Sequence, residues 1–376
     1  MAISFIRKFT KGFFVILNSM GCLVFLIACL SPYINPENWP IIGFLALLVP
    51  YLVVALLFSI IFWLIVKPVL SLLPFITLLL GWKQLAVIVA WHAGATFTAA
   101  PKTDSTIRLI TWNVRGMYGI STNPYKQQRD RLQIFATIRD LNPDIVCLQE
   151  FNTSYNQKRP TALNLQLFSE VFPYHYFSKD YVSASKTSAA GSIIFSKHPI
   201  VFSDKIKFPG NSSESLLYAD IAIGRDTIRS FTTHLQSYKF NSNDYADIEK
   251  IKSNDADVLS SASENIYSKM KLAFQQRAQQ SAIVKAAIKQ SPYPSIVCGD
   301  FNDVPNSNTY FTIRGPRQDA FLAGYFGIGT SFDALAPTLR IDYILPDNHF
   351  NILQFDMVDE GLSDHHMLVT DVSLKK

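Results

Sequence analysis

The chain has little of several features that mark particular classes of protein. Only four of its 376 residues are cysteine, which excludes a disulfide-stapled scaffold. Charged residues make up 17% and hydrophobic residues 49%, a balance that excludes intrinsic disorder. With 16 glycines and 19 prolines, a collagen-like repeat is excluded as well. The length suits about two folded units.

A surplus of positive charge on the larger part of the chain is also missing. The formal net charge is +5, but residues 1–100 hold five Lys or Arg residues against one acid, whereas the remaining 276 residues hold 29 against 28. A protein that grips nucleic acid nonspecifically normally carries a surplus on its folded domain. The balance therefore disfavours tight nonspecific DNA binding, although it does not exclude a nuclease.

Long apolar runs occupy the first part of the chain. Residues 13–31 and 41–66 carry no charge, and each is long enough to cross about 30 Å of hydrocarbon as a helix. Residues 69–91 are apolar but interrupted at Lys83, which predicts either a third span or a short span followed by an interfacial segment. A cleaved signal peptide is the alternative for the first run, but a second span follows it. We predict a transmembrane anchor of two to three helices over residues 1–91.

The basic residues of this region predict its orientation. Arg7, Lys8 and Lys11 precede the first run, the loop 32–40 has no Lys or Arg, and Lys67 follows the second run. The positive-inside rule places the N-terminus and Lys67 in the cytoplasm. Three spans would put the rest of the chain outside the cytoplasm, and two would keep it inside. We predict an integral, multi-pass protein with an extracytoplasmic C-terminal domain.

Residues 92–104 are small and polar and predict a linker. From residue 105 to 376, short apolar runs of strand length alternate with helical patterns at 127–141 and 269–290, which predicts a layered α/β domain. The polar stretch 238–266 reads as a loop or loosely helical insertion that could rim a pocket. Cys147 and Cys298 lie in strand patterns and are expected in the core. The expected strands are 108–114, 144–150, 192–196, 217–223, 228–235, 294–300 and 341–345.

Polar side chains stand at the ends of these strands, where α/β proteins gather their sites. They are Asn113, Glu150, His234, Asp300, Asn302, Asp342, Asp364 and His365. Each alone has a structural explanation as a turn or cap, but together they are not expected from packing, because burying unpaired carboxylates is costly. His366, beside His365, is expected to pack or face solvent.

The residue types suit hydrolysis of a phosphate ester. Oxygen donors such as Glu150, Asp364 and Asn113 suit Mg²⁺ or Mn²⁺, which would neutralise phosphoryl oxygens. Asp300 or His365 could accept a proton from the attacking water. A carboxylate such as Asp342 could hold the imidazole in one tautomer.

The order of these motifs resembles the endonuclease/exonuclease/phosphatase superfamily over about residues 105–376. The motifs are TWNVRG (111–116), DIVCLQE (144–150), GSIIFSKHPI (191–200), TTHLQS (232–237), CGDFND (298–303), RIDYIL (340–345) and SDHHM (363–367). GDFN, RIDYIL and SDH in this order are the specific part. The apolar N-terminal runs and the helix before GDFND look like the membrane-anchored bacterial branch.

The resemblance implies a four-layer α/β sandwich and a Mg²⁺-dependent phosphoesterase. It implies that Glu150 binds the metal, with Asn113 nearby and Asp364 assisting. His234 and Asn302 would contact the scissile phosphate, and Asp300 would orient or deprotonate the water. Asp342 would pair with His365, and whether Asp300 or His365 is the base stays open.

Two departures disfavour the abasic-site DNA-repair branch. Arg115 stands where that branch carries an acid, and that branch lacks the block at 233–235. The expected partners are the lipid bilayer and a phosphate-ester substrate, which could be a lipid head group, a nucleotide or nucleic acid; no stable protein partner is implied. The alternatives are an extracytoplasmic nuclease and an inactive membrane-bound adaptor.

Overall fold

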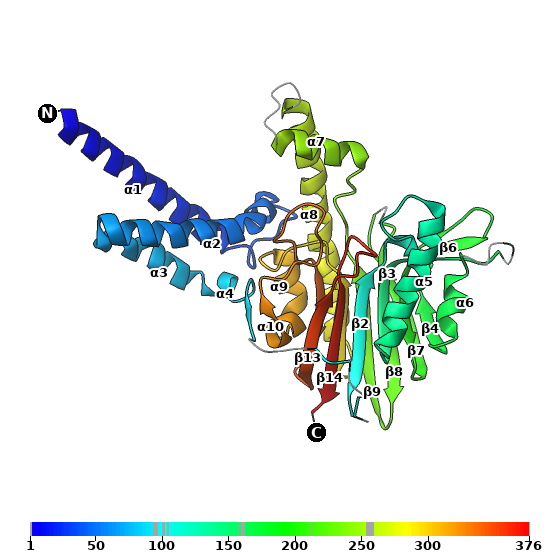
Figure 1. Cartoon of the computed structure of the whole chain (residues 1–376). Coiled ribbons are helices and arrows are strands. Elements are labelled where there is room, and N and C mark those ends of the chain that lie inside the picture. Colours follow the sequence, from blue (N-terminus) through cyan, green and yellow to red (C-terminus); the bar gives the residue numbers. More distant parts are fainter. Residues whose placement is uncertain are drawn as a thin grey trace.

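Two stacked β-sheets with helices on both outer faces form the larger part of the chain (Figure 1). The computed structural model describes residues 2–92, 97–99, 102–103, 105–156, 158, 162–210, 212–252 and 259–375. The four-layer α/β sandwich expected from the sequence is confirmed.

The larger sheet has the strand order β13-β14-β2-β3-β6-β4 among the described residues, with β5 paired to β6. Its strands are β2 (Ile107–Asn113), β3 (Ile145–Ser154), β4 (Tyr174–Phe177), β5 (Tyr181–Val182), β6 (Ser188–Ser196), β13 (Phe350–Val358) and β14 (Met367–Leu374). Strands β2 and β3 run parallel, so their carboxyl ends meet at one edge.

The smaller sheet has the order β12-β10-β9-β8-β7, and within it β9 and β10 run parallel. Its strands are β7 (Ile200–Lys207), β8 (Ser215–Ile223), β9 (Asp226–His234), β10 (Ser295–Asp300) and β12 (Asp342–Pro346). Residues such as Leu109 and Ile145 of one sheet pack against Leu217 and Ile296 of the other. Cys147 and Cys298 are buried in this same layer, as expected.

Helices cover the outer faces. Helix α5 (Pro124–Asp140) and helix α6 (Asn164–Ser169) lie on the larger sheet, where Ile134, Ile138 and Phe168 are fully buried. Helix α8 (Leu259–Lys289) and helix α9 (Asn308–Arg314) pack on the smaller sheet. The short helix α10 (Ala320–Gly324) contacts the edge strands β13 and β12 of the two sheets. The apolar stripe at helical spacing around 269–290 explains why α8 packs there, through Val284 and Ala287.

The polar stretch 238–266 begins as a loop at 238–241 and is helical over 242–252 and 259–266. Helix α7 (Ser242–Lys252) and the first turns of α8 form a helical pair that stands above the sandwich (Figure 1). Asp244 holds the pair together, because its buried carboxylate accepts hydrogen bonds from Asn265 and Lys269 of α8. The described part of this stretch therefore combines the loop and the helical insertion that the sequence suggested.

Two helices of the N-terminal region are long and apolar enough to cross a membrane. They lie within α1 (Ala2–Ala28) and α2 (Ile41–Val66). A signal sequence near an N-terminus has the same length and apolar composition, as does the buried core helix of a soluble protein. Residues 69–91 do not form a third long helix. They divide into η1 (Pro68–Ser71), α3 (Leu72–Leu80), α4 (Trp82–Leu85) and β1 (Ala90–Trp91).

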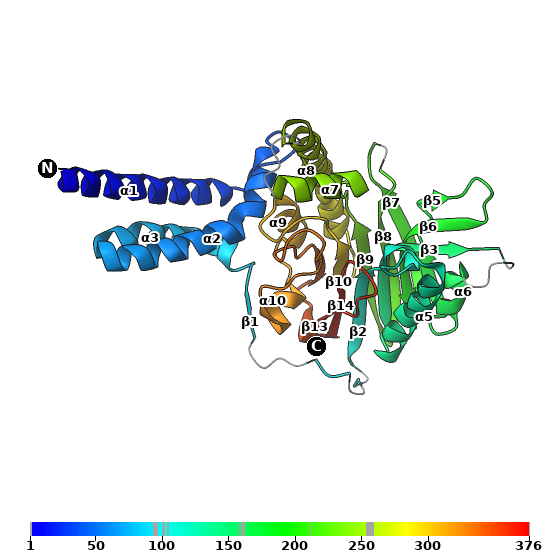
Figure 2. The same cartoon turned by 45° about the horizontal axis from the view of Figure 1, so that its top comes forward.

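The N-terminal helices pack against one another and against the sandwich (Figure 2). Strand β1 pairs with β11 (Phe326–Gly327), and the buried side chains of Val87 and Ala90 belong to sandwich cores. The packing of the sandwich therefore begins before residue 92, where the sequence placed the start of a linker. The part of 92–104 that the structure describes forms no helix.

Candidate active site

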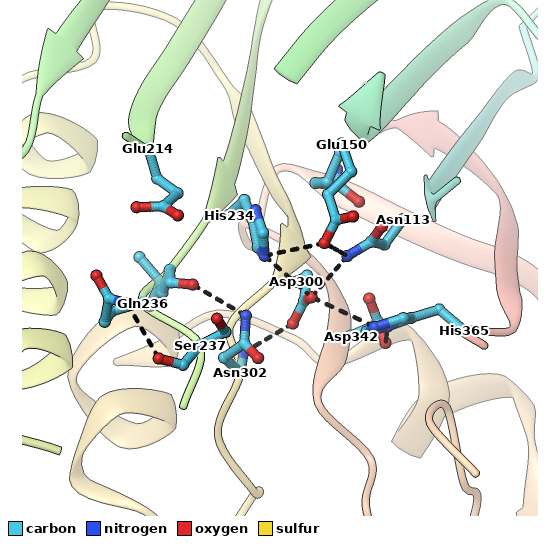
Figure 3. A network of polar contacts seen from close by, with 12 residues as sticks. Asn113, Glu150, Glu214, His234, Gln236, Ser237, Asp300, Asn302, Asp342 and His365 are labelled. Carbon is cyan, nitrogen blue, oxygen red and sulfur yellow. Dashed lines mark hydrogen bonds and ion pairs between the residues drawn. The ribbon is translucent and has the colours of Figure 1, made fainter. Parts of the chain in front are cut away.

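The polar strand ends meet at one edge of the two sheets (Figure 3). Asp300, the last residue of β10, is the parallel partner of His234 at the end of β9 and the antiparallel partner of Asp342 at the start of β12. Asn113 ends β2 in the facing sheet. Parallel neighbours bring their carboxyl ends to the same edge, which is why residues far apart in the sequence converge here.

Asp300 lies at the centre of the group. Its Oδ2 accepts a hydrogen bond from Asn113 Nδ2 at 3.0 Å, and its Oδ1 accepts one from the backbone N–H of Asn302 at 2.8 Å. The Nε2 atoms of His234 and His365 lie 3.5 and 3.7 Å from the same Oδ2. The Asp300 side chain is 1% exposed. Two imidazoles and two amide groups thus surround one buried carboxylate.

His365 is fixed from both sides. Its Nδ1 lies 2.9 Å from Asp342 Oδ2, and its backbone carbonyl accepts a hydrogen bond from Trp112 Nε1. Burial by itself would lower the pKa of His365, but the carboxylates of Asp342 and Asp300 outweigh it and raise that pKa to about 10. Burial raises the pKa of Asp342 to about 6 despite the nearby imidazole. Near neutral pH the pair is therefore an imidazolium and a carboxylate.

Glu150 reaches the site through an irregularity in its strand. The sequence placed it at the end of a strand, but β3 continues to Ser154, and its register with β6 shifts between Leu148 and Phe151. Glu150 has a φ of 52° at this bulge. A bulge re-aims one side chain without ending the strand. As a result, Glu150 Oε1 accepts a hydrogen bond from Asn113 Nδ2 at 3.2 Å and lies 3.9 Å from His234 Nε2.

Asp364 and Asn302 complete the predicted set. Asp364 lines the same pocket as Asp300, and its contacts are with Arg115 Nε at 3.7 Å and with the hydroxyl of Ser363. Asn302 donates from its side chain to the carbonyl of Leu235. All eight predicted residues lie around one edge of the sandwich, but among the described residues Asp364 forms no hydrogen bond or ion pair with Glu150 or Asn113.

The donor groups fit the divalent ion that the resemblance implies. Carboxylate and amide oxygens are ligands of Mg²⁺ and Mn²⁺, and Glu150, Asn113 and Asp364 supply them beside the pocket. Asp300, Asp342 and His365 form a second group whose donor atoms lie within 4.8 Å of one another. One oxygen of Asp342 is buried without a hydrogen-bond partner among the described residues. Such an atom marks a place where a ligand would be stabilised.

The pocket over these residues has a volume of about 170 Å³ and two kinds of wall. Glu150, His234, Asp300 and Asn302 supply the polar part. An apolar wall comes from Leu47, Tyr238, Phe240, Tyr245, Phe332, Leu335, Leu339 and Ile341. Sequence reasoning identified the polar residues and suggested 238–266 as a rim, and Tyr245 of α7 confirms that rim. It missed Leu47 and the segment 332–339, because nothing in their local pattern marks them.

His366 differs from its neighbour His365. Its Nε2 bonds to Asp333 at 2.7 Å, and its side chain stays 16% exposed.

Arg277 was also missed by the sequence reasoning. It is fully buried behind the pocket, where its Nε donates to Asp303 and its Nη1 to the carbonyl of Gln236. Arg277 therefore holds the two loops that follow His234 and Asp300.

Two sequence profiles match the chain. The sequence profile described as "Endonuclease/Exonuclease/phosphatase family" matches residues 110–365, and that of a domain of unknown function matches residues 11–88. No curated protein matches the chain.

Solved structures show the same fold. An endonuclease/exonuclease/phosphatase from Beutenbergia cavernae is 19% identical with a TM-score of 0.50, and the match covers 72% of each chain. A family protein from Bacteroides thetaiotaomicron is 13% identical with a TM-score of 0.50, covering 72% of this chain and 98% of that one. The profile match spans well over half of the sequence. The chain belongs to the endonuclease/exonuclease/phosphatase family.

Proposed function

We propose that the chain is a membrane-tethered phosphoesterase that uses a divalent metal to hydrolyse a phosphodiester or phosphomonoester. The observation that best supports this proposal is the buried Asp300 carboxylate, which lies within 3.7 Å of the Nε2 atoms of His234 and His365. A packing role alone does not account for it, because a buried carboxylate surrounded by titratable groups is costly and typical of active sites.

Asp300 is the residue that orients and deprotonates the water in this proposal. The Nδ1 atom of His365 is paired with Asp342, and in this proposal its Nε2 atom donates to a phosphoryl oxygen. The water oxygen forms a bond to phosphorus, and the bond from phosphorus to the leaving oxygen breaks. The water proton passes to Asp300, and the leaving oxygen takes up a proton from solvent. His234 and Asn302, fixed beside Asp300, would contact the phosphate.

Glu150, Asn113 and Asp364 would hold the metal, which we take to be Mg²⁺ or Mn²⁺. When bound, such an ion neutralises phosphoryl charge and stabilises the leaving oxygen. Asn113 would supply its side-chain oxygen once its amide group, which now donates to Glu150 and Asp300, had rotated. Arg115 is within 3.7 Å of Asp364 and would limit the negative charge that this part of the site accumulates.

The tether is the packed N-terminal unit. Helices α1 and α2 are antiparallel, and α3 returns toward the sandwich beside them (Figure 1). The C-terminal end of α2, which Lys67 follows in the sequence, lies away from the sandwich on the same side as the N-terminus (Figure 2). The apolar segment Pro68–Leu80 that follows is about 20 Å long as a helix, which is shorter than the hydrocarbon core of about 30 Å. A return crossing by this segment, and with it an extracytoplasmic catalytic domain, therefore requires local thinning of the bilayer.

The test uses the full-length protein in lipid nanodiscs with Mg²⁺ or with EDTA. The substrates are methyl p-nitrophenyl phosphate, p-nitrophenyl phosphate, single-stranded DNA and RNA. We expect turnover of at least one ester with Mg²⁺ alone, and a loss of about 10²-fold or more in kcat for His365→Gln. His366→Gln is the matched control, because it changes the neighbouring imidazole outside the Asp300 group. Metal-independent turnover, or equal effects of the two variants, would overturn the proposal; a strong preference for DNA or RNA would identify a nuclease.

A further inference from the structure

The catalytic pocket borders an apolar groove. The groove has a volume of about 330 Å³ and shares Leu47, Tyr238, Phe240, Leu335 and Leu339 with the pocket over Asp300. Because the same five side chains line both cavities, the groove lies directly beside the pocket over Asp300.

The groove is lined almost entirely by hydrocarbon. Beyond the shared residues, it is formed by Tyr51 of α2, Ile248 and Ile251 of α7, Ile266 and Met270 of α8, and Ala336 and Thr338. None of the described residues that line it is charged. Apolar walls of this kind bind hydrocarbon, whereas a groove for single-stranded nucleic acid carries basic residues along the backbone.

The opposite side of the pocket is polar. A cleft of about 530 Å³ shares Glu150, His234 and Lys239 with the catalytic pocket and extends past Arg115 and Glu214. The catalytic pocket, where the scissile phosphate would bind, therefore lies between a cleft that charged residues line and a groove that no charged residue lines. A substrate that matches both sides has a polar head and an apolar tail.

The apolar groove also borders a predicted membrane span. Leu47 and Tyr51 are one turn apart on the same face of α2, in the first half of its 26 apolar residues. Helix α2 is held against α8, because Phe44 stacks on Tyr267 with ring centroids 5.1 Å apart. A Cβ atom at Gly43 would lie 2.6 Å from the ring of Phe274, so glycine permits this close approach.

We propose that the substrate is a membrane phosphoester with a long hydrocarbon chain, and that the chain lies in the groove between α2, α7 and α8. This inference rests on the proposed phosphoesterase function and names its substrate class. Chain length then determines affinity, since each methylene group buried is worth about fourfold in binding. The α2 face beside the groove lets the chain pass from the bilayer to the site while the phosphate reaches His234 and Asp300.

The experiment compares two substrates that differ only in their chain. Methyl p-nitrophenyl phosphate and dodecyl p-nitrophenyl phosphate have the same leaving group, and methyl phosphate and dodecyl phosphate form the monoester pair. The full-length protein is assayed in nanodiscs with Mg²⁺. Ile266→Asp puts a charge into the groove and Ala336→Trp fills it. Leu272→Asp is the matched control, because Leu272 is on α8 but is 54% exposed and outside the groove.

We expect a higher kcat/KM for the dodecyl ester, and a drop of about tenfold or more in that preference in both groove variants. Turnover of the methyl ester and the Leu272→Asp control should stay within about twofold of the unmodified protein, which also shows that the variants fold. If the dodecyl preference is the same in all three variants, it reflects partition into the bilayer, and the proposal is overturned. It is equally overturned if the groove variants slow both esters alike, or if DNA or RNA is preferred.

A binding measurement separates this proposal from the phosphoesterase proposal. If no ester is turned over with Mg²⁺, the proposed function fails, and calorimetry with dodecyl phosphate and methyl phosphate still reports on the groove. Tighter binding of dodecyl phosphate that Ile266→Asp abolishes and Leu272→Asp does not would support an amphiphile site. Equal binding by both variants would refute it. A lipid that copurifies with the protein and is lost in the groove variants without any change in kcat/KM would also refute it, since the groove would then hold a structural lipid.

Discussion

A buried chain of hydrogen bonds joins the N-terminal helices to the catalytic domain. Asn306 Nδ2 donates to the side-chain oxygen of Gln84 at 2.7 Å, and Gln84 Nε2 donates to Ser31 Oγ at 3.0 Å. All three side chains are at most 1% exposed. Gln84→Leu removes both bonds and leaves an N–H of Asn306 and an acceptor of Ser31 unpaired. At about 1–3 kcal/mol for each of the two groups, we expect a loss of about 2–6 kcal/mol in the free energy of unfolding.

The double variant makes this prediction sharper. Asn306→Leu alone leaves the acceptors of Gln84 unpaired, but Gln84→Leu combined with Asn306→Leu removes both partners of the bond between these two side chains. Replacing both partners of a buried bond by apolar groups costs less than removing one. We therefore expect the double variant to be about 1–3 kcal/mol more stable than the sum of the single effects.

Equilibrium unfolding of the full-length protein by urea, at a fixed detergent concentration, measures these differences. Gln279→Leu is the control, because Gln279 makes the same kind of bond across the same junction, to Glu37 at 2.8 Å, but in an exposed position. Its cost should be under about 1 kcal/mol. Additivity of the two single variants within about 0.5 kcal/mol would refute the reasoning, as would a Gln279→Leu effect equal to that of Gln84→Leu.

Three further outcomes are expected. Arg277→Met should lower the free energy of unfolding by about 3–5 kcal/mol, because it leaves the buried Asp303 carboxylate without its cation; thermal melting of the variant measures this. Mg²⁺ at about 100 times its Kd should stabilise the unmodified protein by about 2.7 kcal/mol and Glu150→Gln much less, and an equal shift in both would show that Glu150 does not bind the ion. A chain that begins at residue 101 should melt below the full-length protein, because it lacks the buried side chains of Val87 and Ala90; an unchanged midpoint would show that they do not contribute.

The polar core of the candidate site was predictable because it follows from strand ends. Asn113, His234 and Asp300 each end a strand in a parallel pair, so one rule of sheet topology brings them to one edge. The apolar runs likewise predicted α1 and α2, since length and the absence of charge are local properties. We expected Glu150 at this edge because we took it as the last residue of a strand. The strand instead continues to Ser154, and a bulge turns the Glu150 side chain into the pocket.

Other elements depend on contacts that no local pattern records. Residues 69–91 have a composition that suits one span, yet they form short pieces, and the last of them pairs with Phe326–Gly327. The polar stretch 238–266 has weak helical periodicity, and Asp244 stabilises its helical pairing through Lys269, 25 residues away. Tertiary partners determined both outcomes, as they often do for segments of weak intrinsic preference.

The apolar wall of the pocket shows most clearly why the substrate class could not be predicted from the sequence alone. Leu47 is one of many leucines in a run that is apolar on every side, so no periodicity separates it from its neighbours. Only the packing of α2 on α8 places it beside residues 238–240 and 335–339. The catalytic residues report the chemistry of the bond that is broken, whereas substrate class depends on this long-range contact. A span that served only as an anchor would have no reason to supply a wall of the catalytic pocket, and Leu47 supplies one.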